Sequence, residues 1–127
     1  MKLVLDTNKY TDFCRNEART VSMLQQAEWI LLPFVVLAEL RAGFRSGSCG
    51  RQNEAFLVRF LSSSRVRVIY ADEQTTHLYA GLFTQLKSQG TPIPTNDLWI
   101  AALAVQHDAL LFSRDAHFDH LPQLPRC

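Results

Sequence analysis

Short, continuous apolar runs alternate along the chain with longer segments in which apolar residues recur at helical spacing. Compact apolar runs bounded by polar or turn residues are typical of strands, and the sequence has four of them, at 2–6, 29–32, 66–70 and 109–113. Apolar residues three to four positions apart predict helices at 7–15, 18–28, 34–45, 53–61, 75–87 and 97–107.

The alternation of strands and helices indicates the fold class. Strands that are apolar throughout are typical of parallel sheets covered by helices on both faces. We therefore expect a three-layer α/β/α fold with a short, mainly parallel central sheet. Residues 121–125 contain two prolines, which is too many for a central strand, so they leave the last edge of the sheet open to question.

Length, charge and cysteine content exclude several classes of protein. A chain of 127 residues suits a single domain, here 1–127, and its net charge of +1 excludes a polybasic protein that binds by overall charge. No apolar run is long enough to span a membrane, and the N-terminus lacks the apolar length of a signal peptide. Three widely spaced cysteines indicate a reducing compartment, so we expect a cytoplasmic protein.

Four acidic residues stand out because of what surrounds them. Asp6 and Asp115 each follow an apolar strand, so both should lie at the carboxyl edge of the sheet. Glu39 lies within an apolar helical stripe, and Asp97 begins an almost wholly apolar helix. Each has an ordinary alternative: a helix cap for the two strand-end acids, an ion pair with a nearby arginine for Glu39, and a favourable helix dipole for Asp97.

Taken together, the four acids indicate a metal site rather than four separate structural roles. Carboxylates gathered in one cleft repel one another, and a divalent cation removes that difficulty. Oxygen-only ligands favour Mg²⁺ or Mn²⁺ over zinc. Such an ion can activate a water molecule and stabilise a leaving oxygen, so metal-assisted phosphodiester hydrolysis is the natural reaction.

The residues around these acids resemble the motifs of a known family. The blocks, in chain order, are Leu5-Asp6-Thr7-Asn8, Ala38-Glu39-Leu40, Asn96-Asp97-Leu98-Trp99-Ile100-Ala101-Ala102 and Ser113-Arg114-Asp115-Ala116-His117-Phe118. Their order and their placement on strands and helices are similar to those of a PIN domain, and more narrowly of a VapC-type toxin ribonuclease. The resemblance extends from the first strand to Phe118.

This resemblance implies an endoribonuclease that depends on Mg²⁺, with Mn²⁺ as a substitute, and cleaves RNA with a metal-activated water. It also implies a homodimer and a cognate antitoxin protein that blocks the acidic cleft. The acidic metal-site and catalytic residues would be Asp6, Glu39, Asp97 and Asp115. Asn8 and Ser113 match polar positions beside the cleft and would orient the acids.

Basic residues are concentrated in one segment of the chain. Residues 41–67 contain six arginines and one acid. RNA binding requires basic groups near the acidic cleft, although a solvated helix face explains the same composition. The candidate RNA contacts are Lys9, Arg41, Arg45 and Arg114.

Other interpretations of the sequence remain open. A PIN-fold RNA-processing nuclease without an antitoxin, or a non-catalytic member that binds protein or RNA, would carry similar motifs. A receiver-type signalling domain fits poorly, because no lysine follows Lys87 and the first strand ends in a single acid. His117 and His120 have the spacing of a metal pair, but no further His or Cys completes a zinc site, which favours a structural or solvent-facing role.

Overall fold

A computed structural model describes all residues, 1–127, as four strands, six α-helices and one short 3₁₀ helix. The strands are β1 (Lys2–Leu5), β2 (Trp29–Pro33), β3 (Val66–Ile69) and β4 (Leu110–Phe112). The helices are α1 (Thr7–Cys14), α2 (Ala18–Gln26), α3 (Phe34–Ser46), α4 (Gly50–Leu61), α5 (Glu73–Gln89), α6 (Thr95–Gln106) and η1 (Ala116–His120).

The strands form one parallel sheet in the order β3-β2-β1-β4. Leu3 on β1 pairs with Ile30 on one side and with Leu110 on the other, so β1 is central. The side chains of β1 from Leu3 to Leu5 are fully buried, as expected for a strand covered on both faces. All four expected strands are present and parallel.

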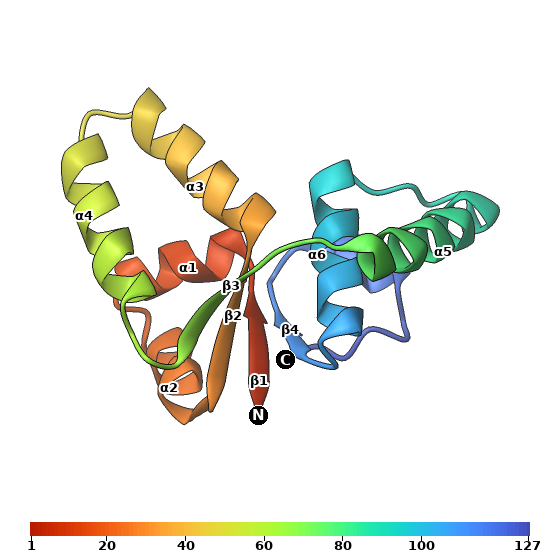
Figure 1. Ribbon diagram of the computed structural model, residues 1–127, viewed down its shortest axis with the longest axis horizontal. Helices are drawn as coiled ribbons and strands as arrows, with labels where there is room; N and C mark the ends of the chain where they lie inside the picture. The colour runs from red at the N-terminus through yellow and green to blue at the C-terminus, as the bar shows by residue number, and fades with distance from the viewer.

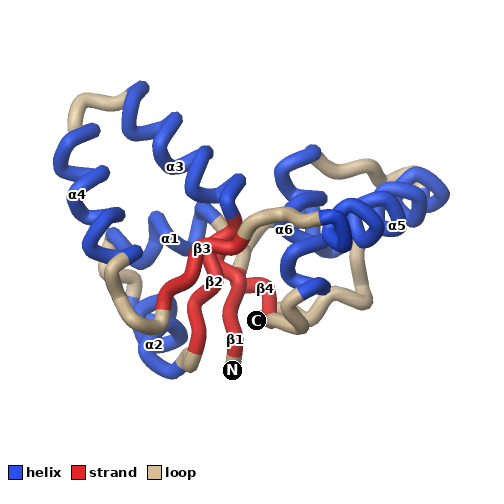
Figure 2. Tube along the Cα trace, viewed as in Figure 1, coloured by secondary structure: helices blue, strands red, loops and turns tan.

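Helices cover both faces of the sheet. Helices α1 to α4 lie on one side and α5 and α6 on the other, with the sheet seen nearly edge-on between them (Figures 1 and 2). The paired helices α3 and α4 project beyond the sheet on one side, and the closely packed pair α5 and α6 projects on the other (Figure 1). The three-layer α/β/α expectation is therefore confirmed.

Several helix ends differ from the sequence expectation. Helix α4 already begins at Gly50, in a stretch expected to be a loop. Helix α5 begins at Glu73 because Asp72 forms a capping box with Thr75, in which each side chain bonds the other residue's backbone N–H. Helix α6 begins at Thr95, two residues before the expected start at 97, and Pro94 before it provides no side-chain cap.

The C-terminal tail packs against the outer edge of β4 without forming a full strand. Arg126 makes a single parallel bridge to Leu111, whose N–H donates to the carbonyl of Pro125 at 2.9 Å. The side chains of Leu121 and Leu124 are buried in the core. The prolines therefore limit this edge to an isolated bridge, as their missing N–H groups predict.

None of the helices combines the length and apolar character that a membrane crossing requires.

Candidate active site

Four carboxylates reach the carboxyl edge of the sheet from four different elements. Asp6 directly follows β1, and Asp115 comes three residues after the end of β4. Glu39 lies on the second turn of α3, which begins where β2 ends, and Asp97 lies in the first turn of α6. Because β1 and β4 are parallel neighbours, their ends bring Asp6 and Asp115 to the same place.

Asp6 is the buried centre of this group. Only 4% of its surface is exposed, and it caps α1 by accepting the Thr7 N–H at 2.7 Å. The Ser113 hydroxyl donates to Asp6 Oδ2 at 2.6 Å, and the Asn8 amide donates to the same oxygen at 3.3 Å. The helix-cap role expected for a lone strand-end acid is therefore present, together with the Ser113 contact, which joins the end of β1 to the end of β4.

Ser113 and Asn8 connect Asp6 to the segment that carries Asp115. Ser113 Oγ accepts the Asp115 N–H at 3.0 Å and the Asn8 amide at 3.3 Å. Asn8 Oδ1 in turn accepts the N–H of Arg114 at 3.2 Å. These bonds hold the chain on both sides of Asp115 in position relative to Asp6.

Asp97 and Asp115 are joined by the imidazole of His117. Its Nδ1 lies 2.7 Å from Asp97 Oδ2 and 3.1 Å from Asp115 Oδ1. The His117 backbone N–H also donates to Asp115 Oδ1 at 2.9 Å, because Asp115 caps η1. Asp97 and His117 are therefore in direct contact, although they are 20 residues apart in the sequence.

Glu39 lies at the exposed rim of the group. Its carboxylate accepts the Thr7 hydroxyl at 3.3 Å, and no lysine or arginine forms an ion pair with it. The alternative of an ion pair with Arg41, Arg45 or Arg59 is therefore wrong. Arg41 instead pairs with Glu54 on α4.

Burial and the nearby negative charges raise the pKa values of Asp6, Asp97 and Glu39. Burial raises the pKa of Asp6, and the negative charge of Asp115 adds to the effect against the lowering by Ser113. Burial and the charges of Asp115 and Asp6 raise the pKa of Asp97, although its bond to His117 opposes this. Burial, with the charge of Asp6 as the next cause, raises the pKa of Glu39.

The donor set fits a divalent metal ion. Neither Asp6 nor Glu39 is paired with a positive side chain, and His117 is the only residue that forms an ion pair with the carboxylates of Asp97 and Asp115. The nearest ligand atoms of Asp97, Asp115 and His117 lie within 4.8 Å of one another. A compact set of oxygen ligands with uncompensated negative charge is what Mg²⁺ and Mn²⁺ bind, and the ion would offset the repulsion.

Two of the candidate RNA contacts are occupied by Asp12. Lys9 is buried, with its ammonium 3.6 Å from Asp12 and above the ring of Phe112. The guanidinium of Arg114 binds both oxygens of Asp12, at 3.1 and 3.2 Å. The Lys9 side chain is therefore enclosed in this conformation and presents little surface to a strand of RNA. Arg114 remains half exposed.

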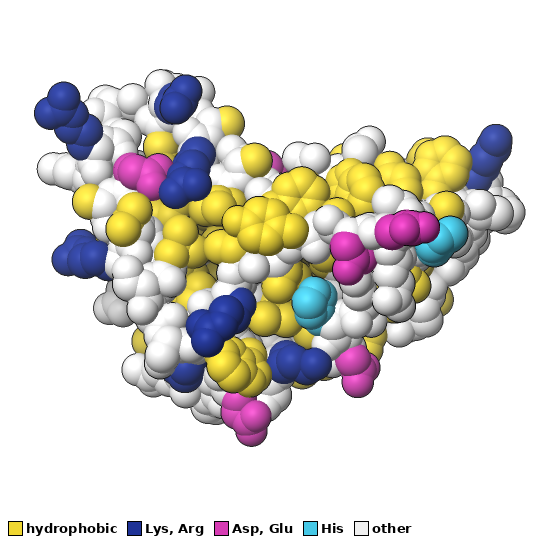
Figure 3. All heavy atoms as spheres, viewed as in Figure 1, with side chains coloured by type: hydrophobic (Ala, Val, Ile, Leu, Met, Phe, Trp, Pro, Cys, Tyr) yellow, Lys and Arg dark blue, Asp and Glu magenta, His cyan; other side chains and the backbone are white.

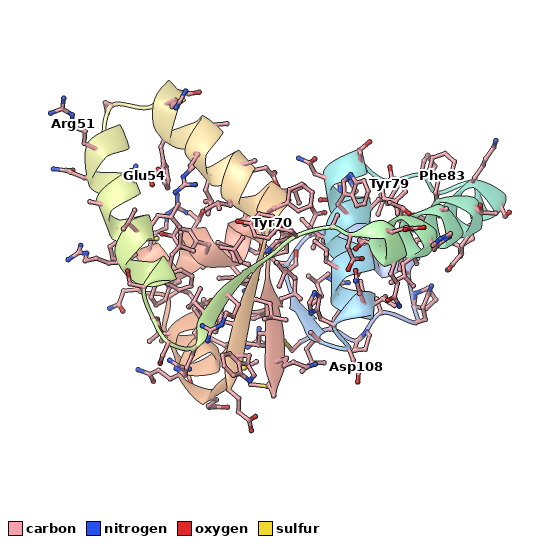
Figure 4. All side chains as sticks on the ribbon, viewed as in Figure 1. Arg51, Glu54, Tyr70, Tyr79, Phe83 and Asp108 are labelled. Carbon is pink, nitrogen blue, oxygen red and sulfur yellow. The ribbon has the colours of Figure 1, made fainter.

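The other two candidates lie on α3, facing α4. Arg41 binds both oxygens of Glu54, which projects from α4 toward α3 (Figure 4). Arg45 has no hydrogen-bond or ion-pair partner and lines a hollow between these helices together with Arg41 and Arg51. Basic side chains are prominent on this part of the surface (Figure 3). Arg45 can therefore bind a phosphate without giving up an existing hydrogen bond or ion pair.

Sequence reasoning misses two side chains of the site. It assigns His117 a structural or solvent-facing role, yet the ring contacts two of the four acids. The position of His117 two residues after Asp115, at a strand-to-helix turn, is the signal that points to it. The second missed side chain is Thr7, whose hydroxyl donates to Glu39.

Comparison with known proteins identifies the family of the chain. The PIN domain family model matches residues 3–124. Ribonuclease VapC1 of Haemophilus influenzae strain R2866 is 34% identical over 121 residues, covering 91% of this chain and 87% of that protein. Ribonuclease VapC2 of Rickettsia felis is 32% identical over 118 residues, covering 92% of this chain and 84% of that protein.

Two solved structures are similar over the whole chain. VapBC2 from Rickettsia felis, bound to a DNA fragment from its promoter, has a TM-score of 0.86 at 29% identity, covering 100% of this chain and 98% of that one. VapBC-1 from nontypeable Haemophilus influenzae has a TM-score of 0.87 at 28% identity, covering 100% and 97%. The fold, the four-acid cluster and these matches show that the chain belongs to the PIN domain family, among the VapC ribonucleases.

Proposed function

We propose that residues 1–127 form a single nuclease domain, a Mg²⁺- or Mn²⁺-dependent endoribonuclease that acts as the toxin of a toxin–antitoxin pair. The observation that carries this proposal is the convergence of Asp6, Glu39, Asp97 and Asp115 without a lysine or arginine to neutralise them. The similar proteins named as VapC ribonucleases support RNA as the substrate. When bound, the metal ion supplies an activated water and stabilises the leaving oxygen of the phosphodiester.

The contacts support a distinct task for each side chain. Asp6 and Asp97 are proposed as direct metal ligands, and Glu39 and Asp115 as ligands that act directly or through water. Ser113 and Asn8 are proposed to orient Asp6, because both donate to its Oδ2. Ser113 also holds the backbone of Asp115, so one hydroxyl positions two of the acids.

The surface supports RNA binding from the α3–α4 side. Arg45 is unpaired there, and Arg41 needs only to exchange Glu54 for a phosphate. Arg114 can offer its exposed face in the same way from its pair with Asp12. Neutralising Arg45 should weaken RNA binding and reduce its salt dependence while leaving metal binding unchanged.

The central experiment compares Asp97→Asn with Asp108→Asn. Asp97 lies in the first turn of α6, whereas Asp108 is exposed just beyond the other end of the helix, away from the acidic cluster (Figure 4). Asp108 has a φ of 49°, a conformation that asparagine tolerates as well as aspartate, so this variant is a matched control. The purified proteins are incubated with total RNA in Mg²⁺, Mn²⁺ or EDTA, and new 5′ ends are mapped.

Cleavage by the wild type and by Asp108→Asn, and its loss in EDTA, are the expected results. Asp97→Asn should lower the rate by about 100-fold or more, beyond the loss typical of a residue that only orients a ligand. Full activity in a folded Asp97→Asn variant would contradict the proposed site. RNA binding without cleavage by the wild type would favour the non-catalytic alternative.

The toxin role is tested separately from the nuclease. Induced expression of the wild type, but not of Asp97→Asn, should arrest growth, and a cognate antitoxin that covers the acidic cleft should restore it. The solved relatives named VapBC support such a partner. Cleavage in vitro without growth arrest would favour an RNA-processing nuclease that has no antitoxin.

A partly exposed aromatic band supports a homodimer. Phe34, Tyr70, Trp99, Tyr79 and Phe83 form a row of neighbouring rings with centroids 4.4 to 6.5 Å apart. Figure 3 shows apolar side chains gathered across this face, and Figure 4 shows Tyr79 and Phe83 on α5 at its far end. Phe83→Ser should shift the protein to monomer in light scattering, whereas Val58→Ser on α4, with similar exposure, should not.

A further inference from the structure

His117 places one ring nitrogen between two carboxylates that come from different elements. Its Nδ1 is 2.7 Å from Asp97 Oδ2 and 3.1 Å from Asp115 Oδ1. The two acids lie on α6 and just before η1, and the ring is half exposed. No other histidine and no cysteine joins this group.

These separations match those between ligands of one metal ion. At metal–ligand distances of about 2.1 Å, adjacent ligand atoms of an octahedral ion lie about 3 Å apart and opposite ones about 4.2 Å apart. The Nδ1 of His117 lies at about the adjacent-ligand separation from both carboxylates, and the three residues can each offer a ligand atom within 4.8 Å of the other two. A metal ion would therefore need only small side-chain movements to contact all three.

We infer that His117 Nδ1 is a metal ligand at the proposed catalytic site, and that it makes the site prefer Mn²⁺ to Mg²⁺. This inference rests on the proposed function for the existence of a metal site. Imidazole nitrogen suits transition metals, whereas Mg²⁺ takes oxygen ligands and keeps its waters. The four acids alone would form an oxygen-only site, so the preference for Mn²⁺ is specific to His117.

The geometry of the backbone favours ligation by Nδ1. The His117 N–H donates to Asp115 Oδ1 at 2.9 Å, which anchors the residue beside that carboxylate. His120, three residues further along η1, is exposed, and its side chain makes no hydrogen bond or ion pair. One histidine of η1 is therefore fixed at the acids, and the other provides a matched control.

The experiment uses the full chain, freed of metal with a chelator and without RNA. Mn²⁺ and Mg²⁺ are titrated by calorimetry into the wild type, His117→Ala, His117→Gln and His120→Ala. Pulsed electron paramagnetic resonance of the Mn²⁺ complexes then detects the magnetic coupling of a coordinated imidazole nitrogen. Circular dichroism in the absence of metal shows whether each variant is folded.

The wild type and His120→Ala should show the nitrogen coupling, and His117→Ala should lack it. Loss of the ligand should weaken Mn²⁺ binding by roughly 10–100-fold and Mg²⁺ binding by less than about threefold, since Mg²⁺ depends on oxygen ligands. His117→Gln should behave like His117→Ala, because an amide restores the hydrogen bond but not the imidazole.

An absent nitrogen coupling in the wild type, or an equal loss of both metals in the variants, would overturn the inference. The wild-type spectrum decides the question even where a variant fails to fold. Metal binding by oxygen ligands alone, with Asp97-dependent RNA cleavage intact, would reject the role of His117 and leave the proposed function standing. Absence of metal binding altogether would reject both.

Discussion

The hydroxyl of Ser113 bonds both to Asp6 and to the backbone of Asp115, so replacing it with a hydrogen should lower the stability of the folded protein. Ser113→Ala removes the donor 2.6 Å from Asp6 Oδ2 and the acceptor of the Asp115 N–H at 3.0 Å. Asp6 Oδ2 would keep only the longer bond from Asn8, at 3.3 Å. The residue is 5% exposed, which limits replacement of these bonds by bulk water.

The size of the effect follows from these contacts. A hydrogen bond to a charged group contributes about 1.5–3 kcal/mol, and an N–H left without a partner costs about 1–3 kcal/mol when it is buried. Because the Asp115 backbone is only partly buried, we expect Ser113→Ala to lower the free energy of unfolding by about 2–4 kcal/mol. In a chain of this size the melting temperature should fall by roughly 8–15 °C.

The loss should also depend on pH. The Ser113 bond lowers the pKa of Asp6, so its removal raises that pKa further. The folded variant then holds the Asp6 proton more tightly than the wild type does, and its stability falls faster as the pH rises. The difference in unfolding free energy should be larger at pH 8 than at pH 4.5.

Urea unfolding followed by circular dichroism in EDTA measures both effects. Ser62→Ala is the control, since its exposed hydroxyl bonds only to a helix carbonyl and its loss should cost about 0.5 kcal/mol or less. A loss below about 0.5 kcal/mol for Ser113→Ala, or one that is equal at both pH values, would refute the reasoning.

Two further predictions concern stability without and with metal, and a third concerns the tail. The pKa values of Asp6 and Asp97 are raised above 3.8 in the folded state, so the stability from their protonated forms is present at acid pH and lost as the pH rises through the raised values. The melting temperature in EDTA should therefore fall as the pH is raised from about 4 to 8. At pH 8, Mg²⁺ or Mn²⁺ at 100 times its dissociation constant should add about 2.7 kcal/mol to the wild type and much less to Asp97→Asn, and an equal gain in both proteins would argue against the site. Arg126 donates to the carbonyls of Ser113 and Asp115 at 3.3 and 3.1 Å, so Arg126→Ala should lower the unfolding free energy by about 1–2 kcal/mol and slow RNA cleavage; an unchanged cleavage rate would show that the tail does not position Asp115.

Much of the frame of the site follows from the amino-acid sequence alone. The apolar runs that become β1 and β4 are buried on both faces, and strands of that kind are parallel. Parallel strands end at one edge, so the order of apolar and acidic residues is enough to place Asp6 and Asp115 together. Helical spacing places Glu39 and Asp97 along their helices but does not tell which part of the fold each side chain faces. The order of the sequence motifs is therefore needed to assign these two acids to the same site.

Helix ends are less predictable than helix positions. The capping box of Asp72 and Thr75 starts α5 earlier than apolar spacing indicates, and α6 begins after Pro94 without a side-chain cap. Apolar periodicity reports which face of a helix is buried, whereas its ends depend on which side chain satisfies the first free N–H groups.

Which charged groups meet depends on the tertiary structure. Lys9 is enclosed between Asp12 and Phe112, while Arg41 binds Glu54 rather than Glu39. His117 contacts Asp97, which is 20 residues away in the sequence, and local sequence spacing does not predict such a contact. The packing of α3 on α4 brings Arg41 to 3.0 Å from Glu54, and the tertiary fold brings His117 to 2.7 Å from Asp97. At such short distances the energies of hydrogen bonds and charge pairs are large enough to matter.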